Sequence, residues 1–177
     1  MSFLDRLLGR ASASSEATAK TGDTETVRRI ARELADLPPD RARFLAAFAY
    51  VLGRVAHADL SISEAESRSM EGILQRVGAL PPAEAVLAVE IAKSQNRLFG
   101  GTEGYLVTRE LREIVTPEQR EQVLDCLFEV SAAEDAISAT EENLVRQVAS
   151  ELGVDHPEYI AIRTRWSQQR AVLRKAE

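Results

Sequence analysis

The chain has few of the residues on which common catalytic and metal sites depend. It contains one cysteine, Cys126, and two histidines, His57 and His156. A single cysteine cannot form an internal disulfide, and its position in the apolar run VLDCLFEV predicts a buried thiol. Zinc sites need several Cys or His side chains at fixed spacing, and nucleophilic catalysis needs a base beside the nucleophile. The sequence therefore predicts neither a zinc protein nor a hydrolase with a catalytic histidine.

Other patterns are absent as well. No glycine-rich loop matches a phosphate-binding motif. No apolar run approaches the roughly 18 residues of a membrane-spanning helix, and no cleavable export signal is present. The chain has 28 acidic and 22 basic residues, and its net charge of −6 repels a phosphate backbone. We therefore expect a cytoplasmic protein that binds no nucleic acid and has no enzymatic activity.

The first residues differ in character from the rest. Residues 1–10, MSFLDRLLGR, predict a short amphipathic tag. The apolar side of this tag consists of Phe3, Leu4, Leu7 and Leu8. Residues 11–22 are small and polar and indicate a flexible linker, so residues 23–177 are the predicted domain. We expect the tag to make transient contact with a membrane surface or with a groove of a partner.

Apolar residues in the predicted domain recur with a period near 3.6, which is typical of helices packed against a core. Capping boxes at Ser63, Thr116 and Ser138 mark helix starts, and Asp40 is expected to cap a long helix. The other helices are expected at 25–37, 64–77, 82–97, 103–115, 117–133, 139–152 and 156–174. The sequence thus predicts an all-α, compact bundle of about seven to eight helices.

One acidic stretch occurs twice. Residues 58–66 read ADLSISEAE and residues 133–141 read AEDAISATE, and an offset of 75 residues aligns the two. The same offset keeps core positions in register, pairing Met70 with Val145, Ile73 with Val148 and Gly78 with Gly153. We therefore expect two pseudo-symmetric helix–loop–helix units that bury these apolar positions at a shared interface.

Three stretches also carry a family resemblance. They are RVAHADLSISEAESRSMEGILQRVGAL, GTEGYLVTRELREIVTPEQREQVLDCLFEV and EVSAAEDAISATEENLVRQVASELGVDHPEYIAIRTRW. In order and spacing they resemble the TerB-like family, associated with tellurite resistance, over roughly residues 40–166. The resemblance implies a helical domain of bacterial stress operons without accepted enzymatic activity. It also implies divalent-metal binding through acidic residues and action near the inner face of the membrane.

The acidic loops allow two interpretations. In one, their carboxylates cap helix starts and face water. In the other, the loops meet and hold a divalent cation such as calcium or magnesium, although the spacing after Asp59 does not match an EF-hand. The candidate metal ligands are Asp59, Glu64, Glu66, Glu134, Asp135 and Glu141, with His57 as an additional ligand or pH-sensitive group. Either interpretation is compatible with the predicted fold.

The sequence as a whole predicts a non-enzymatic interaction or sensing domain with a protein partner, and the resemblance implies a stress-response setting. The spacing of Tyr159, Ile162 and Trp166 predicts a core face at the C-terminus. Two rival functions remain. The paired acidic loops would serve a metal-binding protein or metal-dependent enzyme, and the N-terminal tag would serve a peripheral membrane adaptor.

Overall fold

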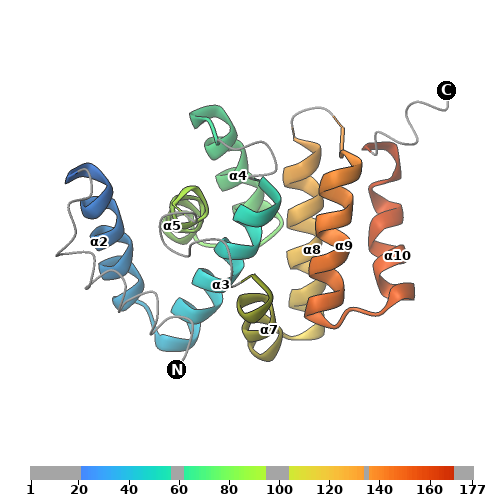
Figure 1. Cartoon of the computed structure of the whole chain (residues 1–177), viewed down its shortest axis with the longest axis horizontal. Helices are drawn as coiled ribbons and strands as arrows, with labels where there is room; N and C mark the ends of the chain where they lie inside the picture. Colours follow the sequence, from blue (N-terminus) through green and yellow to red (C-terminus); the bar gives the residue numbers. More distant parts are fainter. Residues whose placement is uncertain (1–20, 57–61, 95–103, 134–135, 170–177) are drawn as a thin grey trace.

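The computed structural model describes residues 21–56, 62–94, 104–133 and 136–169, and this part of the chain is an all-α bundle (Figure 1). The helices are α2 (Thr21–Ala35), α3 (Pro39–Ala56), α4 (Glu64–Arg76), α5 (Pro82–Lys93), α7 (Gly104–Ile114), α8 (Pro117–Ala132), α9 (Ala139–Leu152) and α10 (His156–Arg165), followed by the 3-10 helix η2 (Ser167–Gln169). The N-terminal tag and most of the predicted linker lie outside the described residues. The predicted all-α fold is confirmed.

Helix α3 lies at the centre of the bundle. It packs against α2, α5, α7, α8 and α9, and its side chains Leu45, Phe48 and Leu52 are fully buried. Every residue from Leu45 to Gly53 is buried, as expected for a helix segment that is apolar on all sides, and the frequent alanines of α3 let neighbouring helices approach closely. The two ends of the molecule are formed by α2 and α10, which lie on opposite sides of this centre (Figure 1).

Helix starts agree closely with the sequence. The capping boxes at Ser63, Thr116 and Ser138 are all present, each with the reciprocal bond from the third residue of the helix. A further box joins Asp155 and Glu158 at the start of α10. This box was not predicted from the sequence, because the capping-box pattern has Ser or Thr as its cap, although Asp is an equally good N-cap residue.

Some helix boundaries differ from the predictions. The C-terminal helix was expected to continue to residue 174, but α10 ends at Arg165 and η2 follows it. At this point the amide of Ile137 donates to the carbonyl of Gln169 at 2.7 Å, which ties the chain after α10 to the segment before α9. Asp40 lies in the first turn of α3, which begins at Pro39, and is not its cap. Helix α2 begins at Thr21, inside the predicted linker.

The repeat is reflected in the core but not in every detail. Met70, Ile73, Val145 and Val148 are all buried in one continuous core. Helix α3 packs against α9 and α8 packs against α4, which is the exchange of partners that a twofold relation between the units would produce. The helix ends differ, however.

Of the two aligned glycines, Gly153 has a left-handed φ of 77° at the end of α9, whereas in the first unit the positive φ, 52°, belongs to Ala79 and not to Gly78. Local geometry at the helix ends is therefore not shared by the two units. The pseudo-symmetry of the two units stays a prediction.

Candidate functional site

The structure describes part of the predicted acidic site. Glu66 and Glu141 are the third residues of α4 and α9, and their carboxylates accept the amides of Ser63 and Ser138. In return, each serine Oγ accepts the glutamate amide at 3.2 Å. Glu64 is exposed in the first turn of α4. Each of these acidic residues lies where a carboxylate stabilises a helix N-terminus.

The remaining candidate ligands lie outside the described residues. These are His57, Asp59, Glu134 and Asp135. Within the part of the chain that the structure describes, no group of three or more His, Cys, Asp or Glu side chains could hold a metal ion. The complete ligand set for calcium or magnesium therefore stays a prediction, whereas the capping role of Glu66 and Glu141 is observed.

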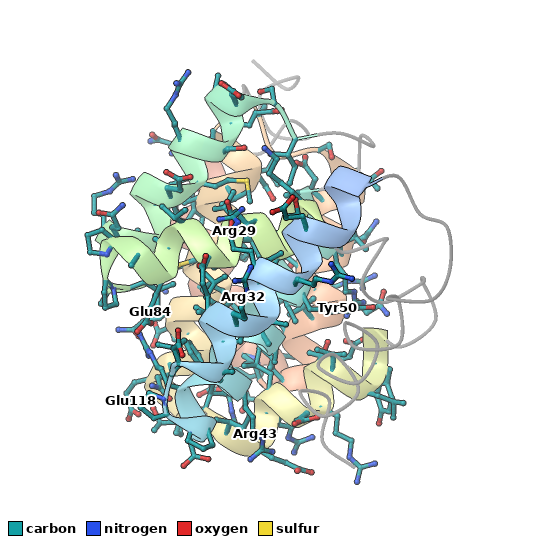
Figure 2. All side chains as sticks on the ribbon, turned by 90° about the vertical axis from the view of Figure 1, so that its left-hand side faces the viewer. Arg29, Arg32, Arg43, Tyr50, Glu84 and Glu118 are labelled. Carbon is teal, nitrogen blue, oxygen red and sulfur yellow. The ribbon has the colours of Figure 1, made fainter. Side chains whose placement is uncertain are left out.

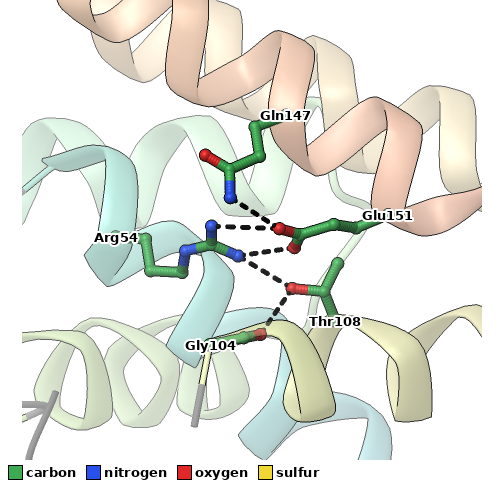
Figure 3. Close-up of polar contacts among 5 residues, drawn as sticks. All are labelled: Arg54, Gly104, Thr108, Gln147 and Glu151. Atoms are coloured by element: carbon green, nitrogen blue, oxygen red, sulfur yellow. Dashed lines mark hydrogen bonds and ion pairs between the residues drawn. The ribbon is translucent and has the colours of Figure 1, made fainter. Parts of the chain in front are cut away.

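A buried ion pair connects three helices and was not predicted. Arg54 of α3 donates to the Glu151 carboxylate of α9 at 2.7 and 3.4 Å and to Thr108 Oγ1 of α7 at 2.9 Å (Figure 3). Thr108 in turn donates to the Gly104 carbonyl at 2.9 Å, and Gln147 donates to Glu151 at 2.8 Å. The side chains of Arg54 and Glu151 are only 14% and 9% exposed. The cluster therefore fixes how α3, α7 and α9 meet.

Hydrogen bonding keeps Glu151 ionised in this position. Burial by itself raises the pKa of the Glu151 carboxyl, but hydrogen bonds to the carboxylate, that from Arg54 foremost, outweigh burial and hold the pKa below its ordinary value. Glu151 lies in the last turn of α9, where the helix dipole disfavours an acid. This unfavourable position was the one sequence signal that Glu151 needed a cationic partner.

A second ion pair corresponds to the first under the repeat. Arg76 at the end of α4 donates to Glu129 near the end of α8. The offset of 75 residues aligns Arg54 with Glu129 and Arg76 with Glu151. Under the repeat, the Arg54–Glu151 pair therefore corresponds to the Glu129–Arg76 pair, with arginine and glutamate exchanged. This is the reciprocal pattern of a twofold interface. It is the strongest support in the structure for two related units.

Other arginines join neighbouring helices in the same way. Arg41 and Arg43 of α3 bind Glu84 of α5 and Glu110 of α7, at 2.6 and 3.2 Å. Figure 2 shows Arg43 and Glu84 on the face of the molecule that also carries α2. Arg163 of α10 binds Glu142 of α9 at 2.6 Å. Many carboxylates of this acidic chain are thus occupied in holding helices together.

The C-terminal aromatic cluster packs as predicted. Tyr159 and Ile162 are buried, and Trp166 is half-buried. The rings of Tyr159 and Trp166 stack on Phe128, with centroids 6.3 and 6.2 Å away. The indole of Trp166 donates to Asp125 at 3.0 Å, which satisfies its polar end. These residues therefore attach α10 to α8.

Cys126 is buried, as its apolar surroundings predicted. Burial, with smaller contributions from the charges of Glu129 and Asp125, raises the pKa of the thiol to about 12. At neutral pH the side chain is a thiol, and the thiol is a far weaker nucleophile and metal ligand than the thiolate. The cysteine therefore serves as a small core residue.

Two grooves flank α10. One, of about 560 Å³, lies between α9 and α10 and is lined by Asn143, Arg146, Gln147, Ser150, His156 and Tyr159 among others. The other, of about 450 Å³, lies between α8 and α10, and its lining includes Glu118, Glu121, Val154, Glu158, Ala161 and Ile162. His156 and Glu158 are exposed, so both grooves open to solvent.

The fold, its capped helices and its cross-helix ion pairs define a helical-bundle protein whose described polar groups have mainly structural roles. Among the described helices, none is long and apolar enough to cross a membrane. The family model for tellurite resistance protein TerB matches residues 44–164. This match covers more than half of the chain, so the chain belongs to the TerB family. Comparisons with curated proteins and with solved structures gave no significant match.

Proposed function

We propose that this TerB-family chain is a non-enzymatic interaction and sensing domain of a tellurite-type stress response. The observation that carries the proposal is the family match over residues 44–164, which spans α4 to α9 and most of α3 and α10. It acts in the cytoplasm or at the inner face of the membrane, and its partner is a protein.

The use of the polar side chains supports this proposal. The carboxylates of Glu66 and Glu141 cap helices, and that of Glu151 is engaged by Arg54. A catalytic carboxylate must instead face a substrate, with a pKa matched to proton transfer. Open grooves beside α10 offer surface for a macromolecule.

The proposal is tested by survival on graded tellurite. A strain lacking the gene is complemented with the wild-type chain, with Cys126→Ala or with Val148→Asp, which places a charge in the buried core and is expected to prevent folding. We expect the first two to restore survival equally, because a buried thiol with a pKa of about 12 takes no part in tellurite chemistry. Val148→Asp should restore nothing.

An assay of the purified chain in vitro tests the non-enzymatic part of the proposal. A non-enzymatic domain should not accelerate the loss of tellurite when it is incubated with tellurite and a thiol reductant, compared with the reductant alone. Equal survival of the deletion strain and the wild type would contradict the stress role. Faster loss of tellurite in the presence of the chain would contradict the non-enzymatic role.

A further inference from the structure

Helix α2 is attached to the bundle by few contacts. It packs on α3 and α5, and in Figure 2 it crosses the face of the molecule in front of them. Of its described side chains, Ile30 and Leu34 are buried, one turn apart on a single face. Arg29 adds an ion pair to Glu90 of α5 at 2.7 Å. The TerB match begins at residue 44, so α2 also lies outside the family segment.

The polar contact beneath α2 is incomplete. Glu90 Oε1 accepts from Arg29, whereas Glu90 Oε2 is buried without a hydrogen-bond partner. Arg29 divides its guanidinium, giving Nη2 to Glu90 and Nη1 to Glu33 at 3.5 Å. An arginine binds a carboxylate best when two of its N–H groups meet both oxygens. With α2 docked, Glu90 Oε2 therefore lacks a hydrogen bond. A different helix, whose arginine had no second carboxylate partner, would be able to donate to both oxygens of Glu90.

We propose that α2 is a displaceable cover, and that the α3–α5 surface beneath it binds an amphipathic helix of a partner protein. This helix carries two aliphatic side chains four residues apart, like Ile30 and Leu34. Directly before the first of these two side chains it carries an arginine that donates to both carboxylate oxygens of Glu90. The inference rests on the proposed interaction role and names the surface and the kind of partner.

Competition with α2 makes this surface testable. While α2 is docked, its short connection to α3 keeps it at high effective concentration and blocks an outside helix. Leu34→Asp weakens α2 without changing α3 or α5, because an unpaired charge is costly at a buried apolar site. Arg32→Asp is the matched control, since Arg32 is on the exposed side of the same helix.

The probe is a fluorescent peptide of residues 21–37 with Glu33→Ala, which releases the second N–H group of Arg29. Titrated against full-length chains, it should bind Leu34→Asp at least tenfold more tightly than the wild type or Arg32→Asp. Adding Glu90→Gln to the Leu34→Asp chain, or Arg29→Ala to the peptide, should weaken binding at least tenfold. Equal affinity for all the chains, or no effect of Glu90→Gln, would overturn the proposal.

Hydrogen exchange of the wild-type chain is an independent test, because it does not depend on whether a variant folds. Amides of α2 should exchange at least tenfold faster than those of α3 and α5, and equal protection would contradict a displaceable cover. Dimerisation by exchange of α2 in sedimentation would assign the surface to a second copy and also contradict the partner helix. If the peptide does not bind but Leu34→Asp still restores survival on tellurite, the proposed binding surface is refuted and the proposed function is not.

Discussion

Removing the cation from the buried pair should destabilise the protein strongly. Arg54→Met keeps the aliphatic stem of the side chain but leaves the Glu151 carboxylate, 9% exposed, without its cation and with only uncharged donors such as Gln147. Loss of one partner of a fully buried pair costs about 3 to 5 kcal/mol. Because the Arg54 side chain retains 14% exposure and Gln147 still donates, we expect a loss of about 2 to 4 kcal/mol at neutral pH.

Urea unfolding followed by circular dichroism measures this loss, provided that the denaturant slope is unchanged. The matched control is Arg76→Met, which breaks the pair related by the repeat. Arg76 is 64% exposed, so this change should cost no more than about 1 kcal/mol. The double variant Arg54→Met with Glu151→Leu should recover much of the stability, because no charge then remains buried.

The pH dependence of the pair follows from its pKa. Glu151 has a folded pKa below its ordinary value of 4.5, so the pair contributes fully above about pH 4.5 and its contribution is lost as pH falls through the lower folded value. The difference in stability between the wild type and Arg54→Met should therefore shrink in acid. Equal costs for Arg54→Met and Arg76→Met at neutral pH would refute the structural role of the buried pair.

Other changes test the helix ends, the core and the thiol. Gly153→Ala should cost about 1 to 3 kcal/mol in urea unfolding, because φ is 77° and a Cβ would lie 2.7 Å from the Arg112 guanidinium. Gly72→Ala in α4, where an added Cβ meets open space, should instead stabilise the protein by about 0.5 to 1 kcal/mol. Changes of the same sign at both glycines would contradict the effect of backbone geometry. Val148→Asp should abolish cooperative unfolding, since Val148 is fully buried, and a wild-type melt would reject the shared core. Cys126 should react with a thiol reagent only at the rate of unfolding, and rapid labelling of the native chain would contradict its burial.

Local signals in the sequence were sufficient for the fold. A period of 3.6 and the capping boxes at Ser63, Thr116 and Ser138 depend on residues within one or two turns, so the helices could be predicted without their neighbours. The end of α10 could not, because it depends on the bond from Ile137 to Gln169, which are far apart in sequence.

The ion pairs were missed for a related reason. Arg54 lies 97 residues before Glu151, and although the position of Glu151 in the last turn of α9 indicates that it needs a cation, nothing local shows which of the 22 basic residues supplies it. The acidic loops were ambiguous because the residue types that cap a helix also ligate hard cations. Glu66 and Glu141 illustrate this, since both were candidate ligands and both are observed as members of capping boxes.

The capping boxes of Glu66 and Glu141 favour the interpretation of the repeated acidic residues as helix caps over metal ligands, and the most direct test of this interpretation is an amide NMR titration with calcium and magnesium. We expect no saturable shifts at millimolar cation and no rise in melting temperature, because caps gain nothing from a cation. Asp59→Asn keeps a side-chain oxygen but removes the charge, so it should fold normally and titrate like the wild type. Saturable micromolar binding that shifts both loops together, and that Asp59→Asn abolishes, would contradict this interpretation and establish the metal site instead.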